Sequence, residues 1–197
     1  PLCRVPNSSS GTCMAPYLAH QANETAWLTA PDRTRLFVRH WHATNGQRRT
    51  GSALIVHGLG EHSGRYGHVA KVLNDRGLEV WAHDHRGFGK SDGARARIPE
   101  QDTLIDDAKF VFGQLQEQLG GIPLLLGHSM GGAIAARAVT GGWITPSALV
   151  LSSPALKSYI SAPMRAATSV LSRLIPNVAV PHGLPLHKIS HDEAVLL

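Results

Sequence analysis

Cysteine and long apolar runs are scarce in this chain of 197 residues. The two cysteines, Cys3 and Cys13, lie in a stretch rich in Ser, Asn, Gly and Pro, where a disulfide would close a small loop and stabilise no core. This disfavours a disulfide scaffold and favours a reducing compartment. No stretch reaches the roughly 20 apolar residues of a membrane span, and the first part of the chain lacks the roughly 7–15-residue apolar segment of a secretory signal. We therefore expect a soluble, cytoplasmic protein.

Charge of one sign is not concentrated anywhere along the chain. Lys and Arg number 19 against 14 Asp and Glu, which gives a formal net charge of +5. The only local groupings are the pair Arg48–Arg49 and the neighbours Arg95 and Arg97. This pattern does not indicate a nucleic-acid groove, and it supports at most a weak attraction to anionic surfaces.

Strand-like and helix-like segments alternate along the chain and predict the α/β class with a mainly parallel sheet. Two strands, Glu24–Leu28 and Leu36–Trp41, are joined by the turn Pro31–Thr34, which predicts an antiparallel hairpin at a sheet edge. The later expected elements are strands at 53–56, 78–83, 123–126 and 148–152, and helices at 66–76, 103–119 and 131–138.

Two of the expected helices have clear apolar faces. In the helix 103–119, apolar residues recur at helical spacing, which predicts core packing, and Asp102 is available as the cap. The second segment, Pro163–Ile175, follows the last strand and ends before Pro176. It is either a lid that covers a substrate or an ordinary packed helix. The apolar positions of the first helix are Leu104, Ala108, Val111, Leu115 and Leu119.

The segment Gly127–Gly132 has the pattern of a nucleophile elbow, the strand-to-helix turn that presents a catalytic serine. The bare G-x-S-x-G pattern is expected by chance on the order of one time in six in such a chain. Its context is more specific, because an apolar strand precedes it and a helix of small residues follows it. We therefore predict that Ser129 is the nucleophile. The alternative, a Gly/Ser loop without a catalytic role, is less favoured.

A second glycine-rich segment, 56–66, follows a buried strand and suits an oxyanion hole. We expect the backbone N–H groups of Leu59 and Met130 to be its donors, the latter because it follows the nucleophile. A purely structural turn is the alternative. The histidines nearby, His57, His62 and His128, lack the fixed spacing of a zinc site, so we expect them to hold loops by hydrogen bonds. We predict no metal and no cofactor.

The turn 84–93 follows another strand, and Asp84 and Arg86 are expected to fix it by a charge-assisted hydrogen bond. The oxyanion segment, this turn and the elbow, in this order, resemble the monoacylglycerol lipase and lysophospholipase branch of the α/β-hydrolases, over residues 15–197. The resemblance implies a lipid-like acyl ester substrate and acyl-enzyme chemistry on Ser129. It also implies a hydrolase core at 15–156 and a lid at 157–197, through which transient contact with a membrane surface is expected. From its composition, we expect residues 1–14 to be a disordered leader.

The order of residues after Ser129 does not supply a complete triad. In this family an Asp or Glu and then a His follow the serine. Here the only acidic residues after Ser129 are Asp192 and Glu193, and no histidine follows either of them. His182, His187 and His191 precede these acids and fall in the lid-like stretch. We expect a C-terminally truncated serine carboxylester hydrolase that lacks its last strands. The alternatives are a non-catalytic α/β-hydrolase scaffold that binds acyl ligands or a partner, and a peptidase of the related serine aminopeptidase group.

Overall fold

The computed structural model describes residues 21–43, 49–100 and 102–157 of the chain. The chain divides into two compact units, Pro1–Leu156 and Lys157–Leu197, and the description below concerns the first. The expected leader at 1–14 and the lid-like segment Pro163–Ile175 lie outside the described residues, as do all the acids and histidines after residue 157.

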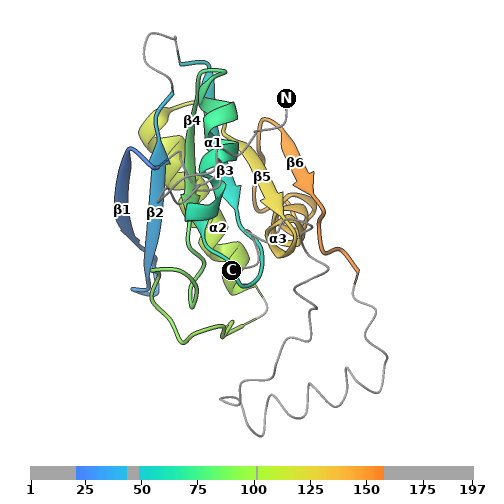
Figure 1. Cartoon of the computed structure of the whole chain (residues 1–197). Helices are drawn as coiled ribbons and strands as arrows, with labels where there is room; N and C mark the ends of the chain where they lie inside the picture. The colour runs from blue at the N-terminus through green and yellow to red at the C-terminus, as the bar shows by residue number, and fades with distance from the viewer. Residues whose placement is uncertain (1–20, 44–48, 101, 158–197) are drawn as a thin grey trace, which may run out of the picture. The chain divides into compact units, whose positions relative to one another are not determined.

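The described residues form a six-stranded sheet in the order β1-β2-β4-β3-β5-β6 (Figure 1). The first two strands pair antiparallel with each other, and β2 pairs antiparallel with β4. The remaining pairs, β4 with β3, β3 with β5 and β5 with β6, are parallel. This confirms the predicted mainly parallel sheet with an antiparallel hairpin at one edge. The strands are β1 (Glu24–Thr29), β2 (Arg35–Trp41), β3 (Gly51–Val56), β4 (Leu78–His83), β5 (Leu124–His128) and β6 (Leu149–Ser152).

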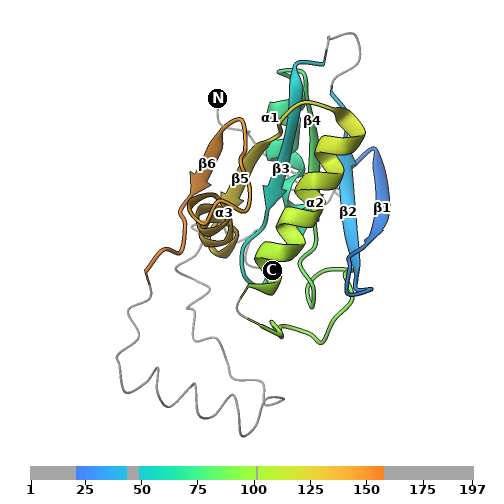
Figure 2. The same cartoon turned by 180° about the vertical axis from the view of Figure 1, so that it is seen from behind.

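Helices cover both faces of the sheet, because alternate residues of the buried strands point to opposite sides. On β3, Ala53 and Ile55 belong to one apolar cluster, and Leu54 and Val56 belong to the other. The first cluster packs against α1, and the second packs against α2 and α3 (Figures 1 and 2). The helices are η2 (Ser63–Tyr66), α1 (Gly67–Asn74), α2 (Thr103–Leu119) and α3 (Met130–Thr140).

Helix α2 has the predicted bounds, but its N-cap differs from the expectation. Leu104, Ala108, Val111 and Leu115 are buried, as their spacing predicts. Asp102 occupies the N-cap position without making a side-chain cap hydrogen bond, and its carboxylate instead pairs with Arg137 on α3 at 2.7 Å. Of the helices in the described part of the chain, none has the length and hydrophobicity needed to cross a bilayer.

The parallel strands place three loops at one edge of the sheet. Because β3, β4 and β5 run in the same direction, their carboxyl ends lie together, which is where α/β proteins build their sites. His57 follows β3, Asp84 follows β4 and Ser129 follows β5. The three motifs that the sequence singles out are thereby neighbours in space.

Candidate active site

Ser129 lies between β5 and α3 in a strained backbone conformation, with φ 52° and ψ −117°. Few residues with a Cβ adopt positive φ, and such strain persists only where neighbouring contacts enforce it. Here the Ser129 N–H donates to the Ser152 carbonyl at 3.0 Å, and the Ser129 carbonyl accepts from the N–H groups of Ala133 and Ala155 at 3.1 and 2.9 Å. All three hydrogen bonds are made by the backbone of Ser129, so they fix the turn without using the serine hydroxyl.

The glycines beside Ser129 are required by close backbone approach. A Cβ on Gly131 would lie 2.1 Å from the Val56 carbonyl oxygen, and one on Gly127 would lie 2.4 Å from the Gly131 carbonyl oxygen. Both contacts are with backbone atoms, so relief needs movement of α3 against β3 in the first case and against β5 in the second. The elbow therefore fits only a sequence with glycine at these two positions.

We expect Gly131→Ala to lower the free energy of unfolding by about 1–3 kcal/mol, because the methyl group collides with β3. The matched control is Gly113→Ala on the exposed side of α2, where a Cβ has no atom within 4 Å. That change removes a flexible residue from a helix and is expected to stabilise the protein by about 0.5–1 kcal/mol. Urea denaturation of both variants checks the pair, and an equal effect of the two substitutions would contradict the clash.

The loop after β3 touches the serine through Gly58. A Cβ on Gly58 would lie 3.2 Å from the Ser129 Cβ, so only hydrogen separates the loop from the side chain. The Gly58 N–H donates to Glu61 Oε1 at 2.5 Å, and the Tyr66 hydroxyl donates to the same oxygen at 2.7 Å. Glu61 and Tyr66 are the site residues that sequence reasoning missed. The signal was present, since both belong to the segment predicted as the oxyanion loop.

His57 fixes the other side of this loop and its own tautomer. Its Nε2 accepts from the His85 N–H at 2.9 Å, so the ring proton sits on Nδ1, which donates to the Gly58 carbonyl at 2.7 Å. Burial lowers the pKa of His57 to about 4, which keeps this tautomer neutral near pH 7. In a trans peptide the N–H points opposite to the C=O. Holding the Gly58 carbonyl therefore also fixes the direction of the Leu59 N–H.

The other two histidines near the site also hold loops by hydrogen bonds. His62 Nδ1 accepts from the Gly64 N–H at 3.1 Å at the start of η2, and His128 Nδ1 lies 3.0 Å from Ser152 Oγ. Together with His57 they play the structural role that the sequence predicts. Within the described part of the chain, no histidine is hydrogen-bonded to the Ser129 hydroxyl.

Asp84 connects its own turn, 84–93, to β2 and to η2 at the carboxyl edge of the sheet. It is fully buried and accepts hydrogen bonds from Arg39 at 2.9 Å, from the Ser63 N–H at 2.8 Å and from the Lys90 N–H at 2.8 Å. Burial raises the pKa of Asp84, but the hydrogen bond of the Ser63 hydroxyl and the three above hold it below its usual value. The expectation that Asp84 pairs with Arg86 was wrong, because Arg86 turns to Asp107 at the N-terminal part of α2.

The buried histidine His83 makes stability depend on pH. Burial lowers its pKa to about 3, against 6.5 for the unfolded chain, so only the unfolded state takes up its proton between those values. The folded state is therefore destabilised as pH falls below 6.5, by about 1 kcal/mol at pH 5.5 for this one group. We expect His83→Phe to reduce the loss of stability between pH 7.5 and 5.5 by that amount in urea denaturation. Any constant packing cost of the phenyl ring cancels between the two pH values, and an unchanged pH slope would contradict the prediction.

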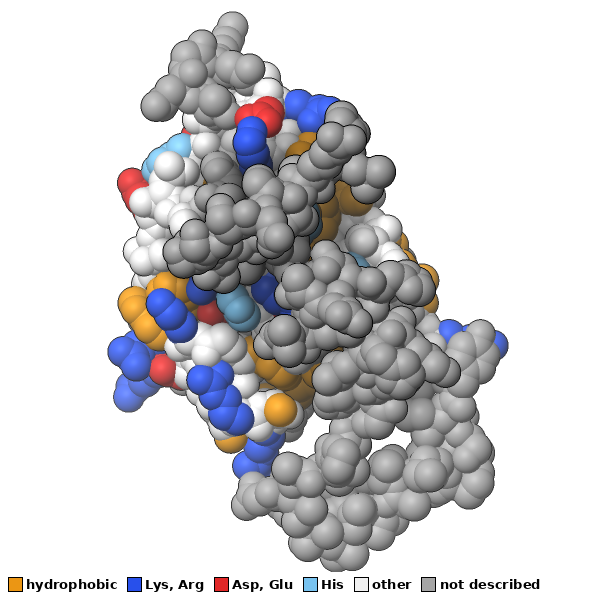
Figure 3. All heavy atoms as spheres, in the orientation of Figure 1, with side chains coloured by type: hydrophobic (Ala, Val, Ile, Leu, Met, Phe, Trp, Pro, Cys, Tyr) orange, Lys and Arg blue, Asp and Glu red, His pale blue; other side chains and the backbone are white. Residues whose placement is uncertain are grey.

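One surface groove among the described residues does not include Ser129. A groove of about 770 Å³ runs beside α2 and is lined by residues such as Arg86, Glu100 and Phe110, while Ser129 is not among its lining residues. On the face seen in Figure 3, Lys and Arg side chains appear at the left, at the top and at the right edge, with hydrophobic and acidic side chains among those at the left. That spread agrees with the scattered charge of the sequence.

A serine at positive φ between a parallel strand and a helix, on a sheet of this order, defines the class of α/β-hydrolases. The chain belongs to the serine aminopeptidase S33 family of hydrolases, whose model matches residues 47–197. Human monoglyceride lipase is 36% identical over 162 residues, covering 78% of this chain and 51% of the relative. Monoacylglycerol lipase of Mycolicibacterium smegmatis is 36% identical over 152 residues, covering 74% of this chain and 53% of the relative.

Among solved structures, the monoacylglycerol lipase of Paleococcus ferrophilus superposes with a TM-score of 0.66 at 34% identity, covering 82% of this chain and 60% of that one. The monoglyceride lipase of Saccharomyces cerevisiae gives a TM-score of 0.74 at 23% identity, covering 92% and 63%, and shows the shared fold. The chain spans about half the length of the curated relatives it matches. These similarities confirm the predicted resemblance to monoacylglycerol lipases.

Proposed function

We propose that the full-length protein is a serine carboxylester hydrolase that cleaves monoacylglycerols or lysophospholipids through an acyl-enzyme on Ser129. The observation that carries the proposal is the strained serine against the Gly58 loop, with a Gly58 Cβ position 3.2 Å from the Ser129 Cβ. The contact supports a nucleophile that lies beside the loop carrying the Leu59 N–H, as acyl transfer requires a nucleophile and N–H donors close together. The names of the relatives support the choice of a monoacylglycerol ester.

In the proposed reaction, Ser129 Oγ attacks the ester carbonyl and loses its proton to a general base. The negative oxygen is stabilised by the N–H groups of Leu59 and Met130, each worth roughly 3–4 kcal/mol. Met130 is the first residue of α3, so its N–H has no partner within the helix and lies at the positive end of the helix dipole. The base returns the proton to the leaving alcohol, and water then attacks the acyl-enzyme to release the acid and restore Ser129.

The general base is a histidine from outside the described residues. Family order places an acid and then a histidine after the serine. His57 cannot take this part, because its two ring nitrogens are engaged by the Gly58 carbonyl and the His85 N–H. Its role in the proposal is to hold the Leu59 N–H toward the reacting oxygen.

The experiment is covalent labelling of the full-length protein with a fluorophosphonate, followed by mapping of the modified peptide by mass spectrometry. We expect one phosphonyl group per chain, on Ser129. An adduct on any other residue would remove the assignment. Comparison of a monoacylglycerol, a lysophospholipid and an aminoacyl amide as substrates then separates the ester hydrolase from a peptidase, which the family description offers as the competing activity.

A further inference from the structure

A cluster of histidine and glutamate side chains, residue types that can bind metal ions, lies at the end of the sheet opposite to Ser129. His40 lies in β2 and His42 directly follows Trp41, its last residue, and both rings lie near the carboxylates of Glu24 and Glu79. Glu24 of β1 is the direct cross-strand partner of His40. Glu79 lies at the start of β4, next to the Val80 that pairs with Trp41. Three strands thus bring four ligating side chains together.

The spacing of three of these groups suits one metal ion. Glu24, His40 and His42 each offer a ligand atom, and these atoms all lie within 4.8 Å of one another. Glu24 Oε1 lies 3.2 Å from His42 Nε2, and Glu24 Oε2 lies 3.9 Å from His40 Nδ1. In tetrahedral zinc sites, bonds of about 2.0–2.1 Å put neighbouring ligand atoms about 3.4 Å apart. Small side-chain movements therefore complete the geometry.

Glu79 supports the two histidines from behind. Its Oε2 lies 2.5 Å from His40 Nε2 and 3.1 Å from His42 Nδ1, and its Oε1 accepts from the Ala43 N–H at 3.2 Å. A carboxylate that accepts the second N–H of each ring leaves the lone pairs on His40 Nδ1 and His42 Nε2, the atoms that face Glu24. Carboxylate–histidine–metal arrangements of this kind orient the ligands of known zinc sites.

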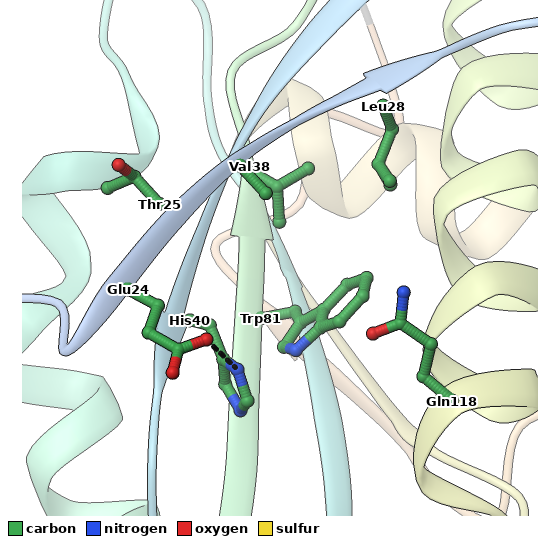
Figure 4. Close-up of a pocket in the computed structure, with 8 residues that line it drawn as sticks. Glu24, Thr25, Leu28, Val38, His40, Trp81 and Gln118 are labelled. Atoms are coloured by element: carbon green, nitrogen blue, oxygen red, sulfur yellow. Dashed lines mark ion pairs between the residues drawn. The ribbon is translucent and has the colours of Figure 1, made fainter.

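A small pocket beside the cluster has an unpaired donor. Glu24, His40 and Trp81 line a pocket of about 80 Å³ (Figure 4). The rings of His40 and Trp81 are 5.7 Å apart, and Figure 4 shows the indole nitrogen on the side of the ring nearer to His40. This Nε1 is buried without a hydrogen-bond partner in the described structure. A buried N–H of this kind is able to donate to a water or anion that completes the coordination of a metal.

We propose that Glu24, His40 and His42 bind a Zn²⁺ ion, with Glu79 as the carboxylate that positions both histidines. Two imidazoles and one carboxylate are ligands that zinc takes readily, and water occupies the fourth place. Because the ligands come from β1 and β2 and their support comes from β4, the ion would link the edge hairpin to the sheet. The inference departs from the sequence expectation of no metal, and it is independent of the chemistry proposed for Ser129.

The test is calorimetric titration of the chelator-treated full chain with Zn²⁺. We expect one site whose affinity falls at least tenfold in His42→Ala and in Glu24→Gln, and 10–100-fold in Glu79→Gln. The matched control is His68→Ala, which removes an exposed imidazole from α1 and leaves the affinity unchanged. Circular dichroism of each variant verifies that it folds.

A second measurement uses Co²⁺ in place of zinc. Tetrahedral coordination by two imidazoles gives visible absorption bands much stronger than those of octahedral Co²⁺, and these bands are expected in the native chain and lost in His42→Ala. Absence of Zn²⁺ binding, or binding that both His42→Ala and Glu24→Gln leave unchanged, overturns the proposal. Since neither readout uses ester hydrolysis, failure here is distinct from failure of the proposed function.

Discussion

Replacement of Ser129 by alanine is expected to lower turnover of a monoacylglycerol ester by the full-length protein about 10⁴–10⁶-fold, the range found when serine hydrolases lose their nucleophile. Without the Oγ, no acyl-enzyme forms, and only the oxyanion donors and substrate binding remain to accelerate attack by water. The fold should survive, because the hydrogen bonds that hold this turn are made by the Ser129 backbone. Steady-state hydrolysis, with thermal unfolding as the check on folding, measures the effect.

The matched control is Ser152→Ala on the neighbouring strand. Ser152 Oγ contacts His128 at 3.0 Å, while its backbone carbonyl is the group that accepts from the Ser129 N–H. Removal of this hydroxyl leaves the backbone ladder intact, so turnover should stay within about tenfold of the native value. Activity of Ser129→Ala within tenfold of the native protein would refute the nucleophile assignment.

Local sequence patterns were sufficient for the architecture. Apolar spacing predicted the helix 103–119 and the strand 78–83 with the bounds that the structure shows. The helix buries one regularly spaced apolar face, and the strand buries a continuous apolar run. The antiparallel hairpin at the sheet edge follows from two short strands around Pro31–Thr34. Ser129, Leu59 and Met130 were found because an elbow and a glycine-rich loop at strand ends are local motifs. Their catalytic roles remain proposals.

Long-range pairing was the part that the sequence could not provide. Arg86 and Asp32 are 54 residues apart in sequence, and Arg86 and Asp107 are 21 apart, yet all three meet in the folded chain. The zinc-binding cluster is similar, since Glu24 faces His40 only through the register of β1 on β2. A one-residue shift of that register would place Glu24 on the other face. The sequence signal for this cluster was the pair His40-x-His42, but the sequence does not show which carboxylate faces it, because that depends on the register of β1 on β2.

Arg86→Met is expected to lower the free energy of unfolding by about 3–5 kcal/mol, because it leaves a buried carboxylate without its partner. Arg86 donates to both oxygens of Asp107, at 2.7 and 2.6 Å, and its third contact is with Asp32 at 2.7 Å. The side chain of Asp107 is 2% exposed. These hydrogen bonds, led by those that Arg86 donates to Asp107, raise the pKa of Arg86, so the guanidinium is charged at pH 7.5.

Two further variants separate the lost ion pair from lost packing. Lys71→Met breaks the ion pair between Lys71 and Asp75, whose two side chains are 57% and 47% exposed, respectively. It should lower the free energy of unfolding by no more than about 0.5 kcal/mol. The double variant Arg86→Met/Asp107→Leu removes both buried charges, and it should regain most of the stability that Arg86→Met loses, because the only carboxylate left without Arg86, that of Asp32, is 51% exposed. Urea denaturation at pH 7.5 measures all three. If the double variant is as unstable as Arg86→Met, the guanidinium acts by filling space between the turn 84–93 and α2, and the electrostatic account of this pair is wrong.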